Sequence, residues 1–277
     1  MGVMDEDLFR KIIDDFSGIA KKHNFCGKVL FCNMGEFFLY PETTIERMRY
    51  VLAAGLEFNI QTNGSLMVPK QIDRLLAAGF KGSFTISCHG ISLGVHDKIM
   101  GVDTERSLAN IDYLLAHYPH ERIGIQSIPY RWPFGETRRT RRHWRQRGVR
   151  VRMPLPNDRG GLVAPLSQRK RHATLLGCSA NRPLGEMIIS FNGDVPLCCN
   201  DMAQKEIVGN LNANTIEEVW NGKKMLEKIQ QIYFNTPSPD NFICRKCELG
   251  VVSHSRFQRL CRNIRHEARK FFFSYIW

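Results

Sequence analysis

The stretch Phe58-Asn59-Ile60-Gln61-Thr62-Asn63-Gly64 alternates apolar with polar residues and then ends in a turn sequence. This period of two predicts a β-strand. Similar strands are predicted at residues 29–32, 84–88, 123–128 and 149–153, and segments with helical spacing lie between them, as at residues 45–52, 72–76 and 108–115. Because strands that alternate with helices form parallel sheets with right-handed crossovers, the first half of the chain is predicted to have an α/β fold.

The predicted strands have two unlike faces. A parallel strand that is covered on both faces is apolar throughout, but here one face alone is apolar, with Phe58, Ile60, Phe84, Ile86, Ile123 and Ile125. The other face carries Asn59, Gln61, Asn63, Thr85, Ser87, His89 and Gln126. A polar face indicates a polar ligand at the carboxyl ends of the strands, and we predict that Asn63, Ser87 and Gln126 contact it. The alternative, for about half of these side chains, is that they hydrogen-bond one another. For His89 we favour a structural role.

Four cysteines in the second half are spaced as ligands of a metal centre: Cys178, Cys198, and the pair in Cys244-Arg245-Lys246-Cys247. A C-x2-C turn places two sulfurs where one metal ion or one edge of a cluster can bridge them. Cys198 is predicted to lie on a hairpin that turns at Gly193-Asp194, with arms at residues 186–191 and 195–198. From spacing alone, a zinc ion and an iron-sulfur cluster both remain open. Disulfides are disfavoured because the cysteine count of nine is odd and no secretory signal opens the chain, so a reducing cytoplasm is the expected compartment.

The chain has 277 residues and 43% hydrophobic content, which is enough for two modest globular domains. No apolar run reaches transmembrane length. We predict a barrel domain at residues 1–154, a linker rich in proline, glycine and charge at 155–177, a cysteine domain at 178–252, and a basic amphipathic helix at 253–277. We expect this last helix to dock on the barrel rather than to lie on a membrane.

Much of the formal net charge of +12 lies in residues 131–152, which include Arg138-Arg139-Thr140-Arg141-Arg142. Such a segment can bind nucleic acid or an acidic partner. We favour a solvated helix face, because few aromatic residues are interleaved there and no RNA-binding motif accompanies them. An acidic substrate or partner stays an open hypothesis.

The segment 178–247 resembles a known domain. It contains Gly193-x4-Cys198, Cys199-Asn200-Asp201, Gly209-Asn210-Leu211, Thr215-Ile216-Glu217-Glu218-Val219-Trp220 and the closing C-x2-C. These motifs resemble the auxiliary-cluster domain of radical S-adenosylmethionine (SAM) enzymes, called SPASM in its long form and twitch in its short form. The long form continues with further cysteines, where this chain has Ser253 and Phe257. The resemblance therefore implies the short form, with one auxiliary [4Fe–4S] cluster on Cys178, Cys198, Cys244 and Cys247.

The first half of the chain resembles the same family. Met34-Gly35-Glu36 resembles the Gly-Gly-Glu motif that holds the amino group of SAM, with Met34 in place of the first glycine. Thr62-Asn63-Gly64 and the strand that contains Ser87 resemble two further motifs of the family. The resemblance implies a partial (β/α)6 TIM-like barrel that lacks its first strand and is followed by a small α+β twitch/SPASM domain. It also implies that Met34, Gly35 and Glu36 hold the methionine end of SAM, and that Ser87 and Gln126 lie near its ribose.

The family's C-x3-C-x2-C loop, which binds the SAM-cleaving cluster, is not found in this sequence. In the family it precedes the first helix, and here Leu8, Ile12, Phe16 and Ile19 already repeat at helical spacing. We therefore expect the loop and the first strand to precede Met1 in a longer protein, so that a second [4Fe–4S] cluster belongs only to that form. A stop codon directly upstream of Met1 would contradict this expectation. Without that strand, the strand at residues 29–32 is expected to leave a bare sheet edge.

The resemblance implies an oxidoreductase or maturase that uses a 5′-deoxyadenosyl radical to abstract hydrogen from a peptide or a sugar-like small molecule. Its implied reductant is a flavodoxin or a ferredoxin. Two alternatives remain. One is a non-catalytic iron-sulfur or zinc protein that acts as a binding partner, and the other is a basic RNA-interacting protein with a zinc ribbon.

Overall fold

The computed structural model describes residues 2–31, 35–129, 135–154, 156–163 and 175–251. The chain forms two compact units. The barrel unit comprises the described residues of Cys26–Pro156, and the auxiliary unit comprises those of Met1–Phe25 and Asn157–Cys261. The predicted helix at residues 253–277, and with it Cys261, lies outside the described residues, as do Met34 and Arg131.

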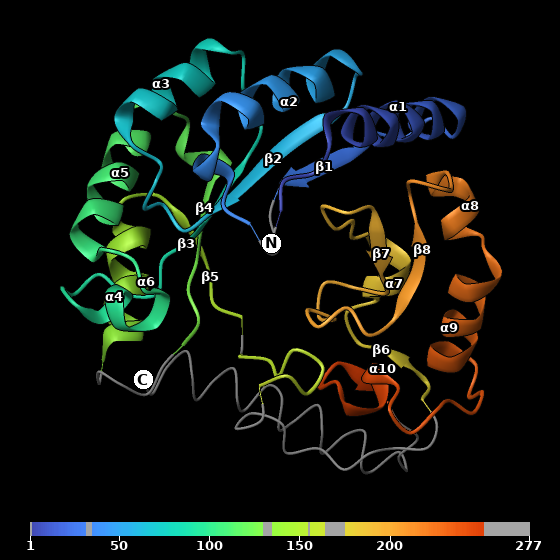
Figure 1. The fold of residues 1–277 in the computed structure, drawn as a ribbon. Coiled ribbons are helices and arrows are strands. Elements are labelled where there is room, and N and C mark those ends of the chain that lie inside the picture. The colour runs from blue at the N-terminus through green and yellow to red at the C-terminus, as the bar shows by residue number, and fades with distance from the viewer. Residues whose placement is uncertain (1, 32–34, 130–134, 155, 164–174, 252–277) are drawn as a thin grey trace. The chain divides into compact units, whose positions relative to one another are not determined.

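The barrel unit is built on a parallel sheet in the order β1-β2-β3-β4-β5 (Figure 1). Its strands are β1 (Lys28–Phe31), β2 (Glu57–Thr62), β3 (Phe84–Ser87), β4 (Ile123–Gln126) and β5 (Arg150–Arg152). Ile60 is in register with Phe84, and Phe84 with Ile123, so the apolar residues form a row across the sheet. Among the described strands, β1 pairs with β2 alone. The predicted α/β fold is confirmed.

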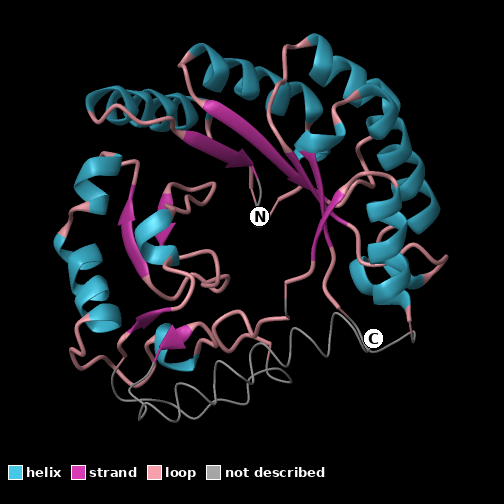
Figure 2. Ribbon diagram, turned by 180° about the vertical axis from the view of Figure 1, so that it is seen from behind, coloured by secondary structure: helices cyan, strands magenta, loops and turns pink. Residues whose placement is uncertain are grey.

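The helices of the barrel unit cover one face of this sheet (Figures 1 and 2). They are η1 (Phe37–Leu39), α2 (Pro41–Ala53), α3 (Pro69–Ala77), α4 (Val95–Met100), α5 (Thr104–His117), η2 (His120–Arg122) and α6 (Glu136–Gln146). The apolar row of the strands is buried, with Phe58, Ile60 and Phe84 at most 1% exposed. The residues between them are partly exposed, as the alternating burial of β3 and β4 shows. The prediction of one apolar and one polar face is therefore confirmed.

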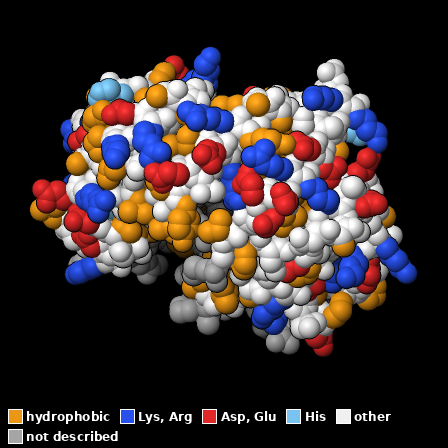
Figure 3. All heavy atoms as spheres, turned by 45° about the horizontal axis from the view of Figure 1, so that its top comes forward, with side chains coloured by type: hydrophobic (Ala, Val, Ile, Leu, Met, Phe, Trp, Pro, Cys, Tyr) orange, Lys and Arg blue, Asp and Glu red, His pale blue; other side chains and the backbone are white. Residues whose placement is uncertain are grey.

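Helix α6 buries one side and exposes its arginines. Thr137, Thr140 and Trp144 form its buried stripe, and Trp144 is fully buried. The arginines of the helix, among them Arg138, Arg139, Arg142 and Arg145, are exposed or partly exposed. On the face of the molecule seen in Figure 3, basic and acidic side chains are interspersed. No helix in the described part of the chain is both long and apolar enough to span a membrane.

The auxiliary unit combines short elements from both ends of the described sequence. They are α1 (Glu6–Lys22), β6 (Gly177–Cys178), α7 (Arg182–Gly185), β7 (Asp194–Pro196), β8 (Ile207–Asn210), α8 (Ile216–Trp220), α9 (Lys223–Tyr233), α10 (Ile243–Lys246) and β9 (Gly250–Val251). Antiparallel pairs form between β6 and β9 and between β7 and β8. The sequence places α1 ahead of the barrel strands, yet its Leu8 and Ile12 belong to the core of this unit, together with Val195, Val208 and Phe242.

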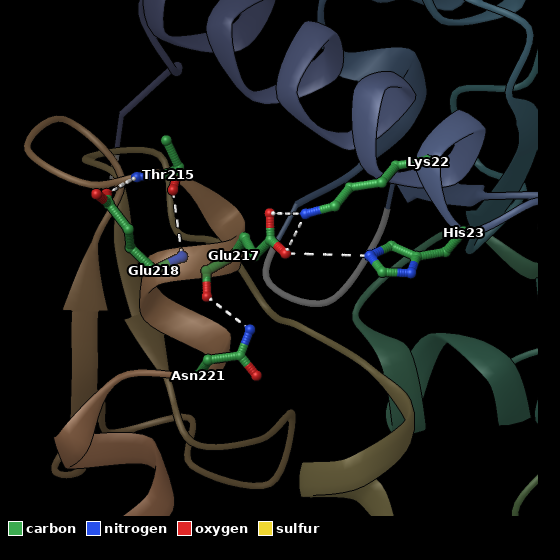
Figure 4. A network of polar contacts seen from close by, with 6 residues as sticks. All are labelled: Lys22, His23, Thr215, Glu217, Glu218 and Asn221. Atoms are coloured by element: carbon green, nitrogen blue, oxygen red, sulfur yellow. Dashed lines mark hydrogen bonds and ion pairs between the residues drawn. The ribbon is translucent and has the colours of Figure 1, made fainter.

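Polar contacts also fasten α1 to the auxiliary unit. Lys11 Nζ donates to the carbonyls of Leu211 and Asn214, at 2.6 Å each. The carboxylate of Asp15 accepts from the N–H of Ile216 at 2.6 Å, in the first turn of α8. Figure 4 shows the far end of α1, where Lys22 Nζ lies 2.8 Å from a carboxylate oxygen of Glu217. These contacts join α1, from Lys11 to Lys22, to the first turn of α8 and to the residues just before it.

One expectation for this unit was wrong in detail. Strand β7 pairs with β8, and the predicted arm at residues 186–191 forms no strand, although the Ser190 N–H donates to the Asp194 carbonyl across the turn at 2.8 Å. Thr215 and Glu218 form a capping box at the start of α8, with bonds of 3.2 and 2.8 Å (Figure 4). Helix α8 ends at Trp220, and Gly222 is the N-cap of the next helix, α9. Leu226 on α9 is 51% exposed.

Candidate functional site: a four-thiol centre and a polar sheet edge

The β6–β9 pair brings Cys178 to the C-x2-C loop. Cys178 lies in β6 opposite Gly250, and the next residue, Ser179, donates its N–H to the carbonyl of Leu249 at 2.8 Å. Cys244 lies in α10, and Cys247 follows directly after that helix. The carbonyl of Cys247 accepts from the N–H of Gly250 at 3.0 Å, which folds the loop back on the strand.

The structure brings the four predicted ligands within electrostatic reach of one another. Cys198 interacts electrostatically with Cys247 and with Cys178. Cys244 interacts with Cys198, Cys247 and Cys178, and Cys247 also interacts with Cys178. Each of the six possible pairs is therefore within electrostatic reach. All four thiols are free of disulfides in the structure.

Burial disfavours ionisation of three of these thiols, those of Cys198, Cys244 and Cys247. It is the main cause that raises the pKa of Cys198 to about 11 and the pKa of Cys244 well above its ordinary value, and the neighbouring cysteines add to both shifts. Burial also raises the pKa of Cys247. Since four thiolates side by side in a buried site repel one another, they need a cation that takes up their charge. The donor set is that of an all-cysteine iron-sulfur or zinc centre.

The structure distinguishes Cys198 from its neighbour Cys199. The Cys199 sulfur accepts from Arg182 Nη1 at 2.8 Å, and Arg182 also pairs with Glu186 at 2.9 Å. The pKa of Cys199 is raised to about 12 by burial and by Glu186, and within the quartet only Cys198 acts on it. Across the described residues, no three histidine, cysteine, aspartate or glutamate side chains are arranged as the ligands of a single metal ion.

The polar edge of the barrel unit is organised around Glu36. Its carboxylate accepts from the Thr62 hydroxyl at 2.6 Å and from the Asn63 N–H at 3.0 Å, at the carboxyl end of β2. It also accepts from the N–H of Phe38 at 3.4 Å. Glu36 thus shapes the turn after β2. The amide oxygen of Asn63 accepts from Ser65, so its Nδ2 is the group that Asn63 can offer to a ligand.

Two neighbouring strands carry the other predicted contacts. Ser87 is in register with Gln126, and both are partly exposed at the carboxyl ends of β3 and β4. Beside them, the buried Ser127 Oγ has no hydrogen-bond partner within the described structure. Buried polar atoms that lack partners in the protein are expected next to a ligand or ordered water. The edge therefore fits a polar ligand.

Sequence reasoning missed two residues that build this edge. His96, on α4, accepts through Nδ1 from the N–H of His89 at 3.3 Å, and His89 Nδ1 accepts from the N–H of Ile128 at 3.0 Å. Glu136 is buried and accepts from Ser92 Oγ at 2.7 Å and from the Ile91 N–H at 2.6 Å. The isolated acidic residue at the start of an arginine-rich helix was the available signal for Glu136. His96 had none.

The histidine pair predicts a loss of stability in acid. Burial, and then the charge of His96, lowers the pKa of His89 to about 4. Below about pH 6.5 the unfolded chain binds a proton at His89, whereas the folded chain binds it only near pH 4. The free energy of unfolding therefore decreases as the pH falls through this range, by up to about 1.4 kcal/mol per pH unit. We expect His89→Gln to flatten this dependence in urea unfolding between pH 7 and 4, and the exposed His117→Gln to leave it unchanged. Equal slopes for both variants would contradict the expectation.

Two family models match this chain. Residues 4–128 match the radical SAM superfamily, and residues 178–248 match SPASM, an iron-sulfur cluster-binding domain. Together they account for about seven tenths of the sequence. The fold and the four-thiol centre agree with both matches. The chain belongs to the radical SAM superfamily and carries a SPASM domain.

Two relatives and two solved structures show the range of similar proteins. An AdoMet-dependent heme synthase from Methanosarcina barkeri is 31% identical over 41% of this chain, and the match spans only 31% of that protein. An S-adenosyl-L-methionine-dependent 2-deoxy-scyllo-inosamine dehydrogenase from Niallia circulans is 22% identical over 80% of this chain and 72% of its own length.

Among solved structures, BtrN in complex with AdoMet and 2-DOIA has a TM-score of 0.56 at 16% identity, covering 90% of this chain and 81% of BtrN. Streptococcus suis SuiB bound to its precursor peptide SuiA has a TM-score of 0.58 at 15% identity, covering 86% of this chain and 63% of SuiB. At these identities the likeness shows a common fold.

Proposed function

We propose that this chain is part of a radical SAM/SPASM enzyme that abstracts hydrogen from a peptide or small-molecule substrate. In this proposal Cys178, Cys198, Cys244 and Cys247 hold an auxiliary [4Fe–4S] cluster, and the polar edge at Gly35, Glu36, Asn63, Ser87 and Gln126 holds SAM. The proposal is supported by the SPASM match and by the four thiols of that segment, each of which lies within electrostatic reach of the other three. When bound, the cluster supplies one-electron chemistry.

The chain's own residues support each part of this proposal. Glu36 accepts from the Asn63 N–H in the turn after β2, and Asn63 Oδ1 accepts from Ser65, so Asn63 Nδ2 is the group that this turn can offer to a ligand. Ser87 and Gln126 offer a hydroxyl and an amide side by side. One of the named relatives acts on an inosamine and one of the similar structures holds a peptide. The proposal therefore includes both a small molecule and a peptide as substrate classes. In this proposal a flavodoxin or a ferredoxin is the reductant.

Anaerobic reconstitution tests the proposal on the chain itself. We expect a brown protein with about four iron and four sulfide per chain, and saturable SAM binding in equilibrium dialysis. The combined Ser87→Ala and Gln126→Ala change should weaken SAM binding and leave the iron content unchanged. Stoichiometric zinc without iron would support the alternative of a zinc-binding interaction protein. Iron without SAM binding would support a non-catalytic iron-sulfur protein.

A further inference from the structure

Hydrogen-bond donors are distributed unevenly around the four thiols. The N–H groups of Asn200 and Asp201 hydrogen-bond to the sulfur of Cys198. The sulfur of Cys247 accepts from the N–H of Leu249 and from Asn200 Nδ2, the latter at 3.7 Å. In the part of the chain that the structure describes, burial and neighbouring charges alone act on Cys244. The donors are thus gathered on the Cys198 and Cys247 side.

Asn200 is common to both sulfurs. Its backbone N–H reaches Cys198, two residues earlier, and its side-chain amide reaches Cys247, which lies 47 positions later in the sequence. The N–H of Asp201, by contrast, is shared with the carbonyl of Cys198 at 3.0 Å. Asn200 is only 2% exposed, so water does not compete for its amide. A hydrogen bond in such surroundings has a stronger electrostatic effect than one in water.

The orientation of the Asn200 amide follows from the chemistry of a ligated sulfur. A thiolate accepts hydrogen bonds and cannot donate them, so only Nδ2 can face Cys247 when the centre is loaded. This orientation leaves Asn200 Oδ1 buried without a partner in the described structure. A buried amide oxygen without a partner costs stability. We attribute the unpaired Oδ1 to the hydrogen bond that Nδ2 donates to the Cys247 sulfur.

A buried carboxylate acts on the same sulfur in the opposite sense. Asp158 is fully buried, and its charge raises the pKa of Cys247. A negative charge near a cluster disfavours the added electron, whereas an N–H donor to a ligand sulfur favours it. Asn200 and Asp158 therefore have opposing effects on one corner of the centre.

We propose that Asn200 is a positioning residue that raises the reduction potential of the auxiliary cluster by donating to two of its four thiolates, Cys198 and Cys247. This inference rests on the proposed function, since it requires that the four thiols hold a cluster. Dithionite supplies one electron per cluster, and no covalent bond to Asn200 forms or breaks. Substitution of Asn200 removes the side-chain hydrogen bond to Cys247 and keeps the backbone N–H near Cys198.

The test is an EPR-monitored dithionite titration of the anaerobically reconstituted chain. We expect Asn200→Ala to lower the midpoint potential of the cluster, because the reduced state loses a donor. A tenfold loss in the reduction equilibrium corresponds to about 59 mV for a one-electron couple. Asn200→Asp keeps the shape of the side chain but replaces the donor by an acceptor with negative charge, so its potential should fall further. The matched control is Asn221→Ala, since Asn221 is exposed and its amide caps the Glu217 carbonyl at 3.1 Å (Figure 4).

The outcomes separate this inference from the proposed function. If both Asn200 variants have the same midpoint potential as wild type and Asn221→Ala, the inference about Asn200 is overturned and the proposed function is not affected. Failure of both Asn200 variants to load a cluster that Asn221→Ala still loads would also overturn it, because Asn200 would then be needed for assembly. A wild-type chain that assembles no iron-sulfur cluster would overturn the proposed function and this inference together.

Discussion

Replacement of Cys198 by serine is expected to abolish the auxiliary cluster, whereas replacement of the adjacent Cys199 by serine is expected to leave it intact. Both residues are cysteines in the same turn, and the Gly193-x4-Cys198 spacing already favoured Cys198. The structure supports this choice, because Cys198 interacts with the other three thiols while the Cys199 sulfur is held by Arg182 at 2.8 Å. Three remaining thiolates do not satisfy a cluster that needs four.

Iron and sulfide analysis after anaerobic reconstitution measures this difference. We expect wild-type iron content in Cys199→Ser and loss of most of the iron in Cys198→Ser, with the brown colour of the cluster lost in parallel. Circular dichroism of each variant checks that the fold persists. The opposite pattern, with iron lost from Cys199→Ser alone, would show that the ligand assignment is wrong.

Truncation of Ile12 is expected to destabilise the auxiliary unit, although this residue lies more than 160 positions ahead of the nearest cysteine ligand. Ile12 is 7% exposed, and it packs with Val208 and Phe242 in the core of the unit. Removal of a buried aliphatic side chain leaves a cavity, and Ile12→Ala should cost about 2–5 kcal/mol of unfolding free energy. The exposed Arg10, whose side chain pairs with Glu6 on the same helix, provides the control Arg10→Ala.

Hydrogen exchange locates the effect of Ile12→Ala. Amides in β7 and β8 should lose protection, because these strands share the core with α1. Arg10→Ala should leave their exchange rates within experimental error of wild type. Unchanged protection in β7 and β8 of Ile12→Ala would show that α1 is not part of this core.

Much of the barrel unit could be predicted from local pattern. The alternation in β2, β3 and β4 predicted which residues are buried, and Phe58 and Ile60 at 1% and 0% exposure confirm it. A period of two marks a strand whatever lies around it. The hairpin at Gly193 was predicted with the wrong partner strand, because the pairing of β7 with β8 depends on a contact across a loop and not on the turn itself.

The amino-acid sequence by itself determined the strand and helix order and the two faces of the sheet, and it predicted the four thiol donors, because each of these depends on local spacing and residue type. Tertiary structure alone decided that α1 belongs to the auxiliary core, that Cys199 faces Arg182 rather than the quartet, and that Asn200 reaches two sulfurs. These features depend on segments far apart in the chain that meet only when the core closes. The physical reason is that burial and hydrogen bonding act through space, whereas a sequence pattern records only neighbours along the chain.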